Sequence, residues 1–288
     1  ATVDRQSQIV KLSPDLVSRA MDHAPRSYRL GGRTEEVDLL VDGTASYLAT
    51  DGCGVETLDF ETHERRQSRK DDVAAMARVA DYLSSISFYW PMVSAQDHGK
   101  TAPLHEIEAS FANTLKHVQT ETLMGETLAR YGVEMARVIA RDEETMRRRP
   151  PLSSLVCTIA PLAQDKGGIE SALVFAEAGL PVGFMSMATA GSTAPATTAG
   201  TMAVADAEMV SAMALMQMAH PGAPVYHSMM PGIMHPRTGD FLGGGGEAGL
   251  FYPLGVELAH MWGVPTLAGI GTESPGLDWE SGIGVAAN

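Results

Sequence analysis

Six short apolar stretches recur along the chain, and this recurrence limits the possible folds more than any other feature. They begin near residues 87, 119, 153, 181, 225 and 265, roughly 30 to 45 residues apart. Segments with helical spacing of apolar residues separate them, such as the one carrying Leu104, Ile107, Phe111, Leu115 and Val118. Short apolar strands that alternate with amphipathic helices predict βα units and a parallel sheet.

Six successive units favour a TIM-type (β/α)₈ barrel over a doubly wound sheet. The doubly wound fold would place a G-x-G-x-x-G turn after its first strand, and the chain has no such motif there. A closed barrel needs eight strands, so two further units would add roughly 70 residues. We therefore expect an α/β fold with the first six units of a barrel over residues 69–288, and a chain that is truncated.

The first 68 residues have a different pattern of apolar and turn residues. Pro14–Met21 predicts a short helix with Ser13 as its N-cap. Val37–Val41, Ser46–Ala49 and Val55–Phe60 are apolar runs separated by Asp-Gly pairs, which indicate hairpin turns. We expect a β-rich N-terminal segment, residues 1–68, packed on the barrel.

The charge balance excludes some partners. With 21 basic and 35 acidic residues, the net charge is −14, so no basic surplus exists to bind a nucleic acid backbone. No run of about 18 apolar residues predicts a membrane span. Only two cysteines occur, far apart, and they form neither a disulfide framework nor a thiolate zinc pattern. These features fit a cytoplasmic protein.

A barrel places its active site on the loops at the carboxyl ends of its strands. This rule selects six loops: Ser94–His98, Thr120–Thr122, Thr158–Leu162, Ala188–Pro195, Tyr226–Arg237 and Gly269–Asp278. The rule supplies only a location, and the role of each residue needs its own argument.

Aromatic residues stand in two of the expected strands. Trp90 and Tyr226 could bind a quaternary ammonium group through cation–π contacts, worth about 2 kcal/mol when desolvated. Aromatic residues in strands also commonly fill the core. Both interpretations stay open from the sequence.

Histidine and arginine candidates gather after the fifth expected strand. Arg237 could bind a carboxylate through its planar guanidinium, or it could pair with Asp240. His227 could orient a substrate or be a buried structural histidine. The spacing of His220, His227 and His235 matches no standard zinc pattern, so we expect no metal site.

Two loops are rich in small residues. Ala188–Gly200 could let a ligand approach its backbone closely, or it could be a connector in which Ser192 or Thr193 caps the next helix. Gly243–Gly246 could hold a phosphate, but Glu247 follows where a phosphate loop has Lys-Ser/Thr, so we favour a mobile loop that leads into a helix.

Taken together, several of these stretches resemble the trimethylamine:corrinoid methyltransferases. The similar segments are Gly191–Pro195, Thr198–Thr201, Ala205–Glu208, Pro221–Tyr226 and Arg237–Gly239, with Asp59–Arg66 and Gln96-Asp97 earlier in the chain. The resemblance therefore extends over nearly the whole chain.

The resemblance implies a TIM barrel that demethylates a methylated amine. In this family the methyl group passes to the cobalt of a corrinoid (cobalamin) carried by a separate small protein. Some members place pyrrolysine in the loop after strand 6, whereas Gly269–Asp278 reads GIGTESPGLD, with standard residues only. That departure favours quaternary amines such as glycine betaine over trimethylamine.

The same resemblance suggests roles, because such an enzyme must hold its substrate in line with the cobalt and exclude water. The residues expected to bind substrate are Trp90, Gln96, Tyr226, His235 and Arg237. Those expected to take part in catalysis are His227, Glu273 and Asp278. Those expected to face the corrinoid are Gly191, Ser192 and Thr193.

Two alternatives remain at this point. A truncated or degenerate member could bind betaines without turnover. A TIM-barrel lyase or aldolase would usually show a Schiff-base lysine or a carboxylate metal site, but Lys100, Lys116 and Lys166 fall outside the expected strands. Unpaired strands at an open barrel edge predict a homo-oligomer or additional chain that covers them.

Overall fold

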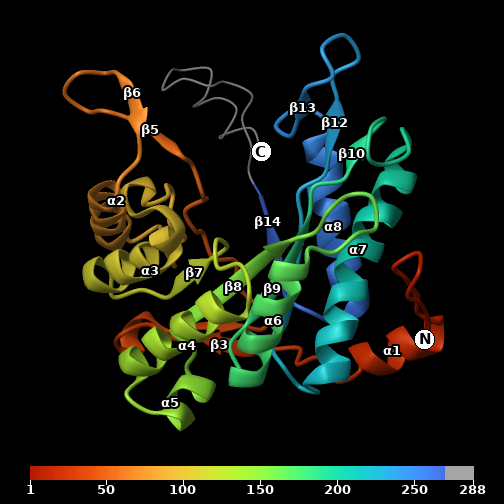
Figure 1. Ribbon diagram of the computed structural model, residues 1–288, viewed down its shortest axis with the longest axis horizontal. Coiled ribbons are helices and arrows are strands. Elements are labelled where there is room, and N and C mark those ends of the chain that lie inside the picture. The colour runs from red at the N-terminus through yellow and green to blue at the C-terminus, as the bar shows by residue number, and fades with distance from the viewer. Residues whose placement is uncertain (270–288) are drawn as a thin grey trace. The chain divides into compact units, whose positions relative to one another are not determined.

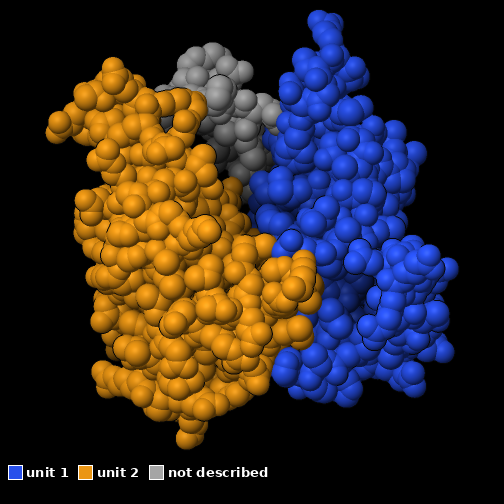
Figure 2. Space-filling view, in the orientation of Figure 1, with its two compact units in different colours: residues 1–26, 157–165, 183–288 blue, residues 27–156, 166–182 orange. Residues whose placement is uncertain are grey.

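The computed structural model describes residues 1–269 (Figure 1). The chain divides into two compact units, which Figure 2 colours separately. The first unit contains residues 1–26, 157–165 and 183 onward, and the second contains residues 27–156 and 166–182. Each unit is described by itself below.

A five-stranded sheet runs in the order β14-β11-β9-β8-β7. Its strands are β7 (Val118–Thr120), β8 (Leu152–Cys157), β9 (Val182–Ser186), β11 (Val225–Met229) and β14 (Thr266–Ala268). The pairs β7–β8 and β11–β14 are parallel. These are five of the six strands predicted from the sequence, and they confirm a mixed α/β fold with a parallel sheet.

The remaining predicted strand, Phe88–Val93, is the first in chain order, and it is extended but does not form a regular strand. Tyr89 makes a parallel bridge to Val118, so the segment lies beside β7. Its pairing is interrupted because Pro91 has no N–H to donate. In addition, the N–H of Trp90 donates to the Thr50 hydroxyl instead of to a neighbouring strand.

The N-terminal hairpins predicted at the two Asp-Gly pairs are wrong. β4 (Leu39–Val41) pairs antiparallel with β3 (Tyr28–Leu30), and β5 (Glu56–Leu58) pairs with β6 (Arg65–Gln67). The residues between them run parallel to Phe88–Val93, with bridges from Ala49 to Phe88 and from Gly54 to Val93. The Asp-Gly pairs therefore connect segments that pair with more distant parts of the chain.

The other elements of the second unit are mostly helices. They are α2 (Lys70–Tyr82), α3 (Ala102–Asn113), α4 (Glu126–Ala140), α5 (Glu143–Arg148) and α6 (Lys166–Ala178), with 3₁₀ turns at Glu35–Val37 and Gln96–Thr101. α2 and α3 pack side by side (Figure 1). One core cluster joins buried residues of both helices to the chain before β7, and its members are Val73, Ala77, Ala80, Tyr89, Val93 and Ala109.

The apolar spacing predicted helix as far as Val118, but α3 ends at Asn113. Asp81 explains the early end, because its Oδ1 accepts hydrogen bonds from the Thr114 hydroxyl (2.8 Å) and from the backbone N–H of Leu115 (2.7 Å). These bonds hold the chain in the extended conformation that leads into β7.

In the first unit the chain begins with the hairpin β1 (Thr2–Asp4) and β2 (Ile9–Lys11), followed by α1 (Pro14–Met21). The backbone N–H of Leu16 donates to the Ser13 side chain, which confirms the predicted cap. Up to residue 269, the other helices of this unit are α7 (Thr198–Ala219) and α8 (Ala248–Trp262), which contact each other. A small sheet has the order β10 (Thr189–Ala190), β12 (Gly232–Met234) and β13 (Phe241–Leu242).

The N-cap of α7 is Thr197, whose side chain accepts a hydrogen bond from the N–H of Gly200, so the capping roles considered for Ser192 and Thr193 are wrong. By length and composition α7 could cross a membrane, which the sequence did not suggest, yet over half of its most apolar window is buried. It also carries Glu208, a buried acid that is bonded within the unit. These features identify α7 as a core helix.

Candidate active site

Side-chain direction divides the β7 region of the second unit into two faces. The Thr122 hydroxyl donates to Glu106 of α3 (2.6 Å), so Thr122 faces the helices. Glu121, in the bend after β7, instead lies near Asp51 and the backbone N–H of Cys53. His117, just before β7, lies with its Nε2 2.8 Å from the Ser153 hydroxyl of β8, and Phe88 contacts its ring edge-on at a centroid distance of 6.1 Å.

Glu106 is a buried carboxylate, and both of its oxygens accept hydrogen bonds. Its Oε1 accepts from the Ser94 hydroxyl (2.5 Å) and the backbone N–H of Ala95 (3.1 Å), and its Oε2 accepts from Thr122. Hydrogen bonds to a charged group are the strong ones, at about 1.5–3 kcal/mol each. Glu106 therefore fixes the chain after Val93 and after β7 relative to α3.

Glu121 has a different environment, because its charge is not balanced. Burial, together with the neighbouring carboxylates of Asp51 and Glu106, raises the pKa of Glu121 to about 7, while the backbone N–H of Cys53 opposes the shift. Burial also raises the pKa of Asp51. In the described part of the chain, the charged groups that act on Glu121 are both acids.

Cys53 lies in the same group of residues. Burial and the charges of Glu106 and Glu121 raise the pKa of the Cys53 thiol, so the thiol stays protonated near neutral pH. It is consequently a poor nucleophile, and its contribution here is the backbone N–H that faces Glu121.

Trp90 completes this group. It is 4% exposed, and its indole Nε1 has no hydrogen-bond partner among the described residues. A Cβ built on Gly52 would lie 2.8 Å from that nitrogen, so the indole N–H lies directly against the Asp51–Cys53 segment, and only glycine fits there. We call Asp51, Cys53, Trp90 and Glu121 the acidic cluster.

Gln96, the other predicted substrate-binding residue of this unit, is exposed at the start of the 3₁₀ turn Gln96–Thr101. Its neighbour Asp97 accepts a hydrogen bond from the backbone N–H of Lys70 (2.9 Å) and so holds the start of α2. Asp97 therefore has a structural role, whereas the side chain of Gln96 faces solvent.

The first unit contains a second fully bonded glutamate at its strand ends. Glu208 of α7 accepts from the hydroxyls of Thr158 and Ser186 (both 2.7 Å) and from the backbone N–H of Leu162 (2.8 Å). Thr158 follows β8 and Ser186 ends β9, so one carboxylate holds both strand ends and the loop after β8. Glu208 is 1% exposed.

His227 faces α7. Its Nε2 lies 3.1 Å from Oδ1 of Asp206, which also accepts from the indole N–H of Trp262 (3.2 Å). His227 is fully buried, and its Nδ1 has no partner within the described residues. By alternation along β11, the side chains of Tyr226 and Ser228 lie on the opposite face of the strand.

Tyr226 lies over β9. A Cβ built on Gly183 would be only 2.0 Å from Cε2 of Tyr226, so the missing side chain of Gly183 is what makes room for the ring. Tyr226 is 5% exposed. Its ring is consequently held rigidly on the face of the sheet that is opposite α7.

His235 and Arg237 belong to the turn between β12 and β13. Nδ1 of His235 accepts from the backbone N–H of Thr238 (3.1 Å) and of Arg237 (3.3 Å), so a neutral His235 carries its proton on Nε2. Within the described part, the exposed Arg237 forms no ion pair, and the considered pairing with Asp240 is absent. His235 shapes the turn that presents Arg237.

Residues Gly191–Thr193 form an exposed turn after β10. The N–H of Gly191 donates to the carbonyl of Ala194, and the Thr193 hydroxyl accepts from the N–H of Thr189 (2.9 Å). The turn therefore has its own internal bonds and an uncharged surface.

The structure thus distributes the predicted residues over both units. Trp90 and Gln96 are in the second, and Gly191–Thr193, Tyr226, His227, His235 and Arg237 are in the first. Glu273 and Asp278 lie outside the described residues. Sequence reasoning missed Asp51, Cys53, Glu106, Asp206, Glu208 and the role of Glu121. The strand-end rule had selected Thr120–Thr122, which contains Glu121, but single-residue patterns gave no reason to choose it.

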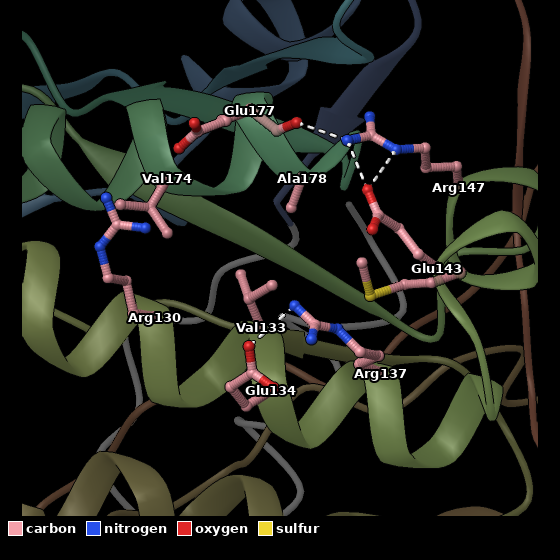
Figure 3. Close-up of a pocket in the computed structure, with 10 residues that line it drawn as sticks. Arg130, Val133, Glu134, Arg137, Glu143, Arg147, Val174, Glu177 and Ala178 are labelled. Atoms are coloured by element: carbon pink, nitrogen blue, oxygen red, sulfur yellow. Dashed lines mark hydrogen bonds and ion pairs between the residues drawn. The ribbon is translucent and has the colours of Figure 1, made fainter.

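A surface cavity of about 270 Å³ between α4, α5 and α6 is a weaker candidate (Figure 3). Its arginines are already paired: Arg130 with Glu126 (2.7 Å), Arg137 with Glu134 (2.8 Å) and Arg147 with Glu143 (3.2 Å). Exposed pairs of this kind contribute little and leave no free charge for a ligand. No group of three or more metal-binding side chains occurs in residues 1–269.

The chain is similar to known proteins of one family. The pattern of the trimethylamine methyltransferase family matches residues 1–283. A trimethylamine methyltransferase of Desulfitobacterium hafniense is 31% identical over 92% of this chain and 54% of its own length. A trimethylamine methyltransferase of Methanosarcina mazei is 30% identical over 97% and 58%. A glycine betaine methyltransferase of Desulfitobacterium hafniense is 27% identical over 95% and 57%.

The chain therefore spans little more than half the length of these curated relatives. The match nevertheless covers almost every residue of the chain, including both units and all the described site residues. The chain belongs to the trimethylamine methyltransferase family.

Proposed function

We propose that the protein is a methyltransferase that moves a methyl group from a methylated amine to the cobalt of a corrinoid held by a separate protein. The family match carries this proposal, since the relatives are named as methyltransferases of trimethylamine and of glycine betaine. We also propose that the parallel sheet belongs to a TIM-type barrel, in which the strand ends form the active site.

The acidic cluster supports a cationic substrate. A trimethylammonium group is positively charged and has no N–H to donate, so aromatic faces and carboxylates recognise it best. Trp90 offers an aromatic ring whose edge lies against Gly52, next to Asp51 in the sequence, and no cation acts on Glu121 from the described residues. We assign Trp90 to the ammonium group, with Gln96 at the entrance and Tyr226 as a second aromatic contact.

The substrate carboxylate needs a different partner. Arg237 is exposed and unpaired within the described residues, and its guanidinium suits a bidentate contact. We assign Arg237 to the carboxylate of a betaine, with His235 fixing the turn. Because Gly269–Asp278 contains only standard residues, we favour a quaternary amine such as glycine betaine, and Glu273 and Asp278 stay the proposed catalytic carboxylates.

The reacting cobalt is supplied by the corrinoid, which when bound provides the nucleophile for the methyl group. The residues present suit that arrangement, since Gly191, Ser192 and Thr193 form an uncharged, internally bonded turn against which a large flat group can pack. The protein's own residues then position the substrate and exclude water. His227, held by Asp206, positions β11 and with it Tyr226.

The corrinoid protein and a small methylated amine are the partners that this function requires. We also propose a cytoplasmic enzyme, since the chain has only two cysteines, far apart in the sequence, and a homo-oligomer.

Methyl transfer to free cob(I)alamin tests the proposal. The protein would be given glycine betaine, carnitine, proline betaine and trimethylamine in turn, and the loss of the cob(I)alamin absorbance would be followed. We expect turnover with one of the quaternary amines. Absence of turnover with all four, also when the corrinoid protein is supplied, would overturn the proposal.

A further inference from the structure

A short turn after β8 presents large apolar side chains to solvent. Ile159 is 51% exposed and Leu162 is 65% exposed, and Met187, which follows β9, is 41% exposed. The backbone N–H of Thr158 donates to the carbonyl of Met185 (2.9 Å), so the two strand ends that carry these side chains are hydrogen-bonded neighbours. We call Ile159, Leu162 and Met187 the apolar tip.

The turn in the apolar tip is firmly attached to the first unit. Ile159 and Ala163 exchange backbone hydrogen bonds in both directions, each of 2.9 Å. The N–H of Leu162 donates to the buried carboxylate of Glu208 (2.8 Å), and the side-chain amide of Gln164 donates to the backbone carbonyl of Glu208 (2.8 Å). The turn that exposes Leu162 is therefore fixed to α7.

Leu162 has a backbone conformation that leucine rarely adopts, with a φ of 57°. Gly, Asn and Asp use this left-handed region most easily, and a bulky residue in it is strained. The exposed leucine side chain gains no burial in return. Such unfavourable conformations are concentrated at functional sites. The leucine at this position therefore indicates a contact that the described residues do not supply.

The chain around the apolar tip carries no charge. No Asp, Glu, Lys or Arg occurs in residues 150–164 or in residues 178–205, although the net charge of the chain is −14. The second of these segments contains the turn Gly191–Thr193, which we assign to the corrinoid. An uncharged surface with large exposed apolar groups suits a partner that docks by apolar burial and not by charge.

We propose that the apolar tip is a docking point for the separate protein that carries the corrinoid, and that this protein contacts it through an uncharged apolar surface. The identity of the partner rests on the proposed function. In a barrel the active site lies at the carboxyl ends of the strands, and β8 and β9 end at the apolar tip. A protein that brings its cobalt to a substrate there has to contact the loops around these ends.

Isothermal titration with the cobalamin-loaded corrinoid protein encoded beside the gene of this protein tests the proposal. Leu162→Asn is the informative variant, because Asn adopts a positive φ more easily than Leu and the turn should keep its shape. We expect its affinity to be about 10- to 100-fold weaker, because one leucine is no longer buried. The wild-type affinity should change less than about threefold between about 50 and 500 mM NaCl.

Met261→Asn is the matched control. Met261 is 66% exposed, close to the value for Leu162, but it lies in the last turn of α8, which leads into the amino end of β14. This variant should bind like wild type. Met187→Ser leaves the turn unaltered, so it keeps the test valid if Leu162→Asn fails to fold, and it should also weaken binding.

Three results would overturn the proposal. They are an unchanged affinity in both tip variants, an equal loss in Met261→Asn, and a wild-type complex that dissociates at high salt. A change in the oligomeric state of Leu162→Asn, measured by analytical ultracentrifugation, would show that a second copy of the chain covers the tip and would also overturn the proposal.

Methyl transfer separates this proposal from the proposed function. Free cob(I)alamin does not have to dock a protein, so Leu162→Asn should transfer the methyl group to it at the wild-type rate, while the KM for the corrinoid protein rises. Binding that depends on Leu162 without any methyl transfer would support the docking point and refute the proposed function. Methyl transfer to a corrinoid protein with a KM that is independent of Leu162 would do the opposite.

Discussion

Replacing Gly183 by alanine tests how Tyr226 is held on the sheet. The new Cβ would lie 2.0, 2.2 and 2.6 Å from Cε2, Cζ and Cδ2 of the ring, so the ring has to move or the strands have to separate. Gly183 itself is buried in β9, which leaves the backbone little room to adjust. Overpacking of this kind costs about 1–3 kcal/mol, and we expect the upper end because three ring atoms are involved.

Urea unfolding followed by circular dichroism measures this loss. Gly249→Ala is the matched control, because a Cβ on Gly249 has open space and alanine favours a helix, so its stability should stay the same or rise slightly. The double variant Gly183→Ala with Tyr226→Leu should recover at least about 1 kcal/mol relative to the sum of the single changes. Additive effects of the two changes would refute the packing of Tyr226 over Gly183.

Three further changes test the charged groups. Glu121→Gln should stabilise the protein above pH 7 by up to about 3 kcal/mol and have little effect at pH 4. The reason is that a raised pKa in the folded state makes the wild-type protein less stable as the pH rises from 4.5 to 7. Urea unfolding at pH 4 and above pH 7 checks this. Glu208→Ala leaves two hydroxyls and one N–H without their acceptor and should cost about 2–4 kcal/mol, against almost nothing for the exposed Glu257→Ala. Arg237→Ala should weaken glycine betaine binding about tenfold and leave tetramethylammonium binding unchanged, and equal losses for both ligands would refute its assignment to the carboxylate.

Regular spacing made the parallel strands predictable. Apolar runs such as Val225–Met229 are bounded by turn residues and followed by helical patterns, so local sequence was sufficient to find them. The pairing of the N-terminal segments was not predictable in this way. The Asp-Gly pair before Gly54 resembles a hairpin turn, yet Gly54 bridges to Val93, and such a long-range pairing has no local signal.

The candidate site was predictable in location but not in detail. The strand-end rule found the loop with Glu121, and aromatic chemistry selected Trp90. The environment that distinguishes Glu121 from the fully bonded Glu106 arises from residues brought together by folding, so no spacing revealed it. The direction of His227 towards Asp206 depends on the phase of β11, which a five-residue apolar strand does not display.

The parallel run of residues 49–54 beside Phe88–Val93 affects how the second unit is assembled during synthesis. Its bridges join positions 39 residues apart in sequence. Residues 49–54 therefore stay unpaired during synthesis until Val93 has left the ribosome. Once in place, it covers backbone groups of Phe88–Val93 that would otherwise be open to another chain. Residues 49–54 therefore cover this edge of the sheet and protect it from pairing with another chain. The same pairing brings Asp51 and Cys53 to Glu121.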